Sequence, residues 1–180
     1  QKVFFLNLQE IKGIKFGTRN PINYFDSFYN AELFLRAHGT YSIKITNPLQ
    51  FYSEVIPRNR DKVDIESINE QYISEFLEAL QSAINQMSAD GTRISYVTSK
   101  ARELGKYMAD ILDEDWTKMR GMEIQSVGIA SVSYDEESQK LINMRNEGAM
   151  LGTDFNVMRG MAMKNLTEGV YEVALEMNLV

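Results

Sequence analysis

Apolar and polar positions alternate over a long stretch, residues 31–46. Its apolar members are Leu33, Leu35, Ala37, Tyr41, Ile43 and Ile45. Because successive side chains of a strand point to opposite faces, the pattern predicts a long, half-buried strand, with Gly39 as the position for a bend or turn. Alternation over so many positions favours an antiparallel sheet with one face exposed to water.

Shorter strands are expected before and well after this one. The apolar runs at residues 3–8 and 14–16 predict two strands joined by a turn, and Asn20-Pro21 predicts a loop. Residues 122–134 are also strand-like, but their apolar phase slips along the run. Such a slip predicts a β-bulge near Gln125-Ser126, because one extra residue in a strand shifts the side chains that follow.

Helical periodicity separates the early strands from the late one. Apolar residues recur every three or four positions over residues 65–87, which predicts a helix that ends near Asp90-Gly91. A second amphipathic helix is expected from Ala101 to about Arg120. Asn47-Pro48 suit the N-cap and first turn of a short helix over residues 49–56.

The last part of the chain turns helical again from Glu136 and is rich in methionine. Six of the ten methionines fall there, and glycines interrupt it. We therefore expect an α+β domain over residues 1–136 and a methionine-rich helical extension over residues 137–180. The apolar side of the extension needs a covering surface: either it is a flexible partner-binding face, or its helices pack on the domain or on a second copy.

Packing or self-association is the favoured hypothesis for this extension. The interface residues it proposes are Met144, Met150, Phe155, Met158, Met161 and Leu166.

Composition narrows the function mainly by exclusion. The 180 residues are 44% hydrophobic and 24% charged, which is typical of one folded domain with a small appendage. The net charge of −6 has the wrong sign for a phosphate backbone, so no nucleic-acid binding is expected. The chain has no cysteine, which excludes disulfides and thiolate chemistry. No apolar run approaches the roughly 20 residues of a membrane span, so this chain should not insert into a bilayer.

Catalytic candidates are sparse. His38 is the single histidine, and its position in the alternation places it on the polar face of the strand, where a surface role is more typical than base catalysis. Asp113, Glu114 and Asp115 are consecutive, and neighbours on a helix point in different directions. They therefore indicate a solvated helix face, with a carboxylate-dependent hydrolase kept as a third hypothesis.

Ligand motifs are not recognisable either. Gly148 and Gly152 lack the lysine of a P-loop, and Gly13 and Gly17 lack the dinucleotide-binding spacing. Aromatic residues cluster near the start without interleaved cations, which favours packing in the core or an interface over base stacking. They are Phe4, Phe5, Tyr24, Phe25, Phe28 and Tyr29. We expect no catalytic residue, no cofactor and no metal.

Several motifs together carry a family resemblance. They are VFFLN at residues 3–7, GTRNP at 17–21, LRAHGTYSIKITNP at 35–48 and GMEIQSVGI at 121–129. With the two helices that precede the last motif, they resemble the SPFH family (stomatin, prohibitin, flotillin; also called band 7), in particular its soluble bacterial, virion core protein-like branch. The resemblance covers about residues 3–150. Its motifs are structural, so no catalytic residue is carried over.

The resemblance implies both a fold and an oligomeric state. The fold is α+β, with a curved, mainly antiparallel sheet and packed helices. Members of the family usually form large homo-oligomers at membranes and act as scaffolds or modulators of partner proteins. This sequence lacks the family's upstream strands and hydrophobic anchor, and also the downstream helices and cysteine-rich zinc ribbon of the bacterial branch. Because it also begins at Gln1, we interpret it as a fragment that lacks both ends.

The sequence thus predicts a non-enzymatic scaffold or assembly domain. It would homo-oligomerise and organise or regulate partner proteins, including a membrane protein, from the cytoplasm or the inner face of a membrane. The alternative is a monomeric regulatory module that recognises a membrane-protein or phage-derived partner through its methionine-rich face. Self-association distinguishes the two hypotheses.

Overall fold

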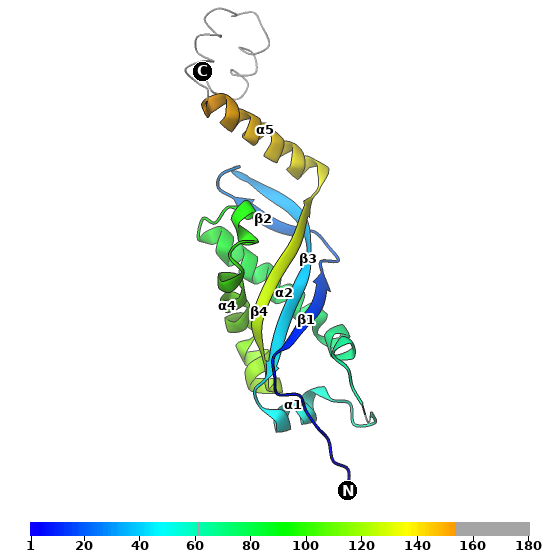
Figure 1. Cartoon of the computed structure of the whole chain (residues 1–180). Coiled ribbons are helices and arrows are strands. Elements are labelled where there is room, and N and C mark those ends of the chain that lie inside the picture. The colour runs from blue at the N-terminus through cyan, green and yellow to red at the C-terminus, as the bar shows by residue number, and fades with distance from the viewer. Residues whose placement is uncertain (61, 154–180) are drawn as a thin grey trace, which may run out of the picture. The chain divides into compact units, whose positions relative to one another are not determined.

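A computed structural model of the chain describes residues 1–60 and 62–153, and it has an α+β fold (Figure 1). It divides into two units, one that ends at Tyr134 and one that begins at Asp135. The first unit contains, in chain order, β1 (Ile11–Gly17), β2 (Ile22–Asp26), β3 (Ala31–Ile45), α1 (Pro48–Val55), α2 (Ile65–Ala89), α3 (Ile94–Val97), α4 (Ala101–Leu112), the π-helical segment Asp113–Lys118 and β4 (Met122–Tyr134). Helix α5 (Glu136–Thr153) belongs to the second unit.

The four strands of the described residues form one antiparallel sheet, as predicted, and β3 lies at its centre. Leu35 pairs with Ile22 of β2 and also with Tyr134 of β4. Further along, Tyr41 pairs with both β1 and β4. Because a strand has only two edges, β1 and β2 lie end to end along one edge of β3, and β4 lies along the other.

The alternation predicted for the central strand is confirmed, because buried and exposed residues alternate from Leu33 to Thr40. The strand runs unbroken through Gly39, where the sequence suggested a bend or turn. The irregularity lies in β4 instead, which carries one extra residue at Ala130 and another at Gln125. The second of these confirms the predicted bulge.

Helices α2 and α4 cover one face of the sheet and enclose the core (Figure 1). Phe76 of α2 is fully buried and stacks on Tyr41, with ring centroids 4.1 Å apart, and on Phe16 at 4.9 Å. Helix α4 packs along β4, and α2 packs against β1 and β2. This one-sided packing explains why the opposite face of β3 is polar.

Side-chain caps begin two of the helices, and the first of these caps, Asn47, was predicted. The Asn47 side chain accepts a hydrogen bond from the Gln50 amide at 3.2 Å and begins α1. Asp64 caps α2 in the same way through the Ser67 amide at 3.0 Å, and the hydrogen bonds from Ser67 lower the pKa of this carboxyl. Helix α2 ends at Ala89, where the sequence placed its stop.

Two local predictions were wrong. No strand forms at residues 3–8, and this extended segment leaves most of its apolar side chains exposed, since β1 and β2 occupy the edge of β3. Strand β2 was missed because Pro21 and Asn23 interrupt its apolar pattern. The helix predicted from Ala101 to about Arg120 does form over that range, with a π-helical turn at Asp113–Lys118 that directs Trp116 into the core.

The helices that the structure describes lie within residues 1–60 and 62–153. No helix in this part of the chain combines the length and the apolarity that a bilayer crossing requires.

Candidate functional site

The acidic and histidine candidates lie in ordinary surface positions. His38 is exposed on β3, as its parity predicted. The Lys118 ammonium contacts Glu114 at 2.6 Å and Asp113 at 3.4 Å. The hydrogen bond and charge of Glu114, followed by those of Asp113, raise the pKa of Lys118. Within the described residues, no three acidic or histidine side chains converge on a position that would hold a metal ion.

The proposed interface residues fall mainly outside the described part of the chain. Met144 lies on α5 and is exposed, and Met150 also belongs to α5. Phe155, Met158, Met161 and Leu166 lie beyond residue 153 and outside the described residues. The proposed interface on this extension therefore stays a prediction.

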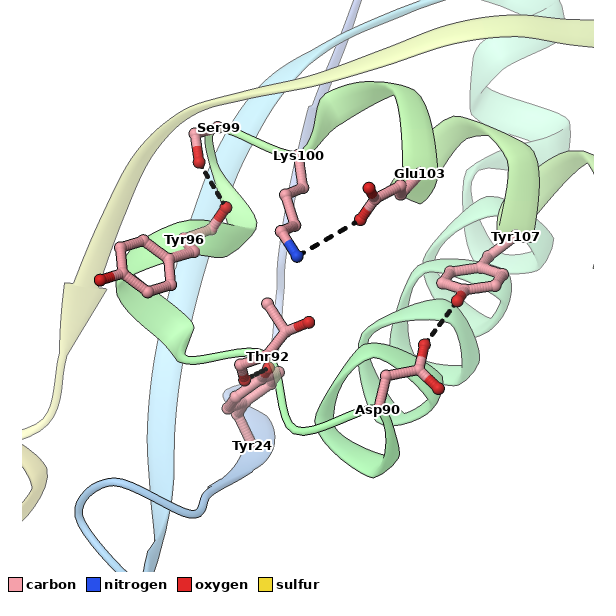
Figure 2. A network of polar contacts seen from close by, with 8 residues as sticks. All are labelled: Tyr24, Asp90, Thr92, Tyr96, Ser99, Lys100, Glu103 and Tyr107. Atoms are coloured by element: carbon pink, nitrogen blue, oxygen red, sulfur yellow. Dashed lines mark hydrogen bonds and ion pairs between the residues drawn. The ribbon is translucent and has the colours of Figure 1, made fainter.

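A polar network joins the end of α2 to α4 and β2 (Figure 2). The Tyr107 hydroxyl donates to Asp90 Oδ2 at 2.5 Å, and the Tyr24 hydroxyl donates to the Thr92 carbonyl. Burial raises the pKa of Tyr24, and the nearby charges of Asp26 and Asp90 raise it further. These contacts are pairwise and satisfied, and they fasten the loop after α2. They do not form a nucleophile and base arrangement.

Sequence reasoning missed the role of Asp26, which is fully buried at the end of β2. Its carboxylate accepts hydrogen bonds from the Phe28 amide at 2.9 Å and from the Ile94 amide at 2.7 Å. It therefore links the β2–β3 turn to α3. The sequence signal for this role was the pair Asp26-Ser27. Aspartate at the start of a turn commonly accepts a hydrogen bond from the backbone amide two residues later.

The aromatic cluster near the start of the chain is divided among different environments. Tyr24 is buried in the core, as the packing hypothesis expected. The guanidinium of Arg93 instead lies over the Phe28 ring, with its Cζ 3.6 Å from the ring centroid. The same Cζ lies 5.5 Å from the ring centroid of Tyr96. The sequence showed no cation near these rings because Arg93 arrives from a distant part of the chain.

Among the residues whose burial the structure describes, the most exposed apolar side chains lie where the N-terminal segment passes α1. We call this surface the N-terminal patch, and its members are Val3, Phe4, Phe5, Leu8, Leu49 and Tyr52. Phe5 is 92% exposed, Leu49 84% and Val3 77%. The Phe4 and Tyr52 rings approach to 5.1 Å, and a shallow pocket of about 380 Å³ opens between the segment and α1. Phe4, Leu8, Leu49 and Tyr52 line this pocket together, and apolar surface gathered in this way marks an interaction site more often than isolated exposed residues do.

Helix α1 is held firmly beneath this patch. The amides of Thr46 and Asn47 both donate to the Gly121 carbonyl, at 2.8 and 3.1 Å. The Gln50 side chain donates to the Lys118 carbonyl at 2.6 Å. Phe51 is buried on the inner side of α1, so the outer side presents Leu49 and Tyr52 from a fixed base.

Basic residues follow α1 directly. Arg58, Arg60 and Lys62 are exposed in the connection to α2, with Asp61 as the acid among them. The N-terminal segment, α1 and this connection lie at the same end of the first unit (Figure 1). This end of an acidic protein thus combines exposed apolar side chains with cations.

Comparison with known proteins matches the chain to one family model. The model of the SPFH domain-Band 7 family matches residues 1–150. No curated protein sequence matches the chain.

Proposed function

Because the chain belongs to the SPFH domain-Band 7 family, we propose that it is a non-enzymatic scaffold domain that self-associates and organises partner proteins at a membrane surface. The observation that carries the membrane part of this proposal is the N-terminal patch. The family resemblance supports the scaffold part, since its members act by assembly. No step of this function needs a catalytic group.

The patch suits the interface of a bilayer better than water. Burying an apolar side chain the size of leucine or phenylalanine contributes roughly 1.5 to 3 kcal/mol. Phe5, Leu49 and Val3 are the side chains with the most surface left to bury. Cations near anionic lipid add about 1 kcal/mol each, and Arg58 and Arg60 are exposed in the connection that follows α1. These features support a peripheral contact with the bilayer interface.

Replacing two of the exposed patch residues, Phe5→Ser with Leu49→Ser, is expected to weaken vesicle binding by about tenfold or more, because two large apolar contacts with the bilayer are lost. Co-sedimentation with vesicles of phosphatidylcholine and phosphatidylserine measures the effect. The matched control is Phe25→Ser, which removes an exposed phenylalanine from β2 instead. Equal binding of the double variant and the wild type would contradict the membrane proposal.

Self-association is tested separately by light scattering on a sizing column over a wide range of protein concentration. Removal of residues 150–180 is expected to lower the native mass, because the methionine-rich extension is proposed to supply an interface. A mass that stays unchanged would remove the extension from the assembly. A monomer at every concentration would favour the partner-binding alternative.

A further inference from the structure

The two edges of the sheet differ in how far helices cover them. Along the outer edge of β1 and β2, side chains of α2 donate hydrogen bonds to strand carbonyls. The pairs are Asn69 with Lys15 at 2.9 Å, Gln81 with Asn23 at 3.1 Å and Ser88 with Phe25 at 2.5 Å. A further strand cannot pair along this edge without displacing these three donors. Helix α2 thus closes it.

The other edge belongs to β4, and α4 covers only its first part. Gly105 of α4 approaches the β4 backbone so closely that an added Cβ would lie 3.7 Å from the Val127 nitrogen. Beyond that point, residues 128–134 pair with β3, and among the described residues no other backbone or side chain is recorded as hydrogen-bonded to them.

The register shows which backbone groups point outward. The Ala37 amide and carbonyl bond to Thr18, on the side of β1 and β2, so the neighbouring even-numbered residues of β3 bond to β4. His38 pairs with Ser131 and Arg36 with Ser133. The N–H and C=O groups of Ile129, Val132 and Tyr134 therefore point away from β3, toward the open edge.

The composition of this edge is unusual for an unpaired strand. Residues 128–134 read GIASVSY and contain no proline, lysine, arginine, aspartate or glutamate. Natural edge strands are commonly protected by charge, proline or a covering element, and here only the bulge at Ala130 provides such protection. In a chain with a net charge of −6, this neutral stretch is a place where two copies can approach without like-charge repulsion.

We propose that residues 128–134 of β4 pair antiparallel with the same residues of a second copy. This inference rests on the self-association in the proposed function and names a surface for it. Because α2 closes the other edge, the pairing stops at two copies and joins two sheets without forming a fibre. Seven residues bury less than the roughly 1,200 Å² of a stable complex, so the dimer is concentration-dependent and serves as a building block.

Val132→Pro tests the pairing without breaking the β3–β4 ladder, because it removes an amide that points outward. We expect the dimer dissociation constant, measured by sedimentation velocity on the full chain, to rise by about tenfold or more, since two-fold symmetry removes two hydrogen bonds at once. The matched control Val132→Ala keeps the amide, so it should change the constant by less than about threefold. Ser131→Lys, on the exposed face, provides a second variant with an intact backbone, and circular dichroism verifies folding of each.

Hydrogen exchange separates the possible occupants of the edge. Protection of the Ile129, Val132 and Tyr134 amides that increases with protein concentration supports a second copy. Protection that is independent of concentration would overturn the proposal in favour of a segment of the same chain. A full chain that self-associates equally well with Val132→Pro would overturn this edge while leaving self-association intact. A full chain that stays monomeric would overturn both the pairing of residues 128–134 and the proposed self-association. The vesicle assay would still test the membrane contact separately.

Discussion

Gly39→Ala is expected to lower the free energy of unfolding by about 3 kcal/mol or more, because the new methyl group has no room between two strands. A Cβ on Gly39 would lie 1.9 Å from the Gly128 carbonyl oxygen and 3.0 Å from the Ile129 Cα. These are backbone atoms, so they cannot rotate away as a side chain would. Relief requires β3 and β4 to separate beside the bulge at Ala130.

Urea denaturation of the purified variant measures this loss. The matched control is Gly17→Ala on β1, where the nearest atom to an added Cβ is His38 Cβ at 3.9 Å. It should change the free energy of unfolding by less than about 1 kcal/mol. A Gly39→Ala variant as stable as this control would mean that the strands are spaced more widely at the bulge. The same substitution should also disturb the open edge of β4.

Gly121→Ala combines two costs and is expected to destabilise the protein by about 3 kcal/mol. The residue has a φ of +65°, a region that costs an L-amino acid about 1 to 2 kcal/mol. An added Cβ would also lie 2.5 Å from the Asn47 carbonyl oxygen. Because Gly121 accepts the hydrogen bonds that hold the start of α1, the substitution should also weaken vesicle binding through the N-terminal patch.

Gly91→Ala provides the comparison that separates these two costs. Gly91 has a φ of +82°, but an added Cβ would meet nothing within 4 Å. This control should therefore lose only the conformational part, about 1 to 2 kcal/mol, in thermal or urea denaturation. Equal losses at the two positions would show that the contact with Asn47 contributes nothing.

Elements with a strong internal period could be predicted from the sequence. The alternation along β3 and the three-to-four spacing along α2 are local properties, and both elements form where they were predicted. Asn47 caps α1 because its side chain reaches an amide only three residues away. The bulge at Gln125 was visible as a slip of phase within one strand.

The candidate surfaces were harder to predict. Residues 3–8 have the apolar pattern of a strand, but β1 and β2 already pair along one edge of β3, and these residues form part of the N-terminal patch instead. The aromatic ring of Phe28 was recognised, whereas its partner Arg93 was not, because the two are far apart in the chain. The interface on the methionine-rich extension stays a prediction.

The sequence by itself determined the family, the α+β class and the periodic elements, because hydrophobic period, caps and glycines act over a few residues. Only the tertiary structure decided which sheet edge is closed by α2 and which is left open at residues 128–134. It also placed Gly39 against the backbone of β4, where an added Cβ has no room. Pairing partners and edges depend on contacts between segments far apart in the chain, and no local pattern encodes them.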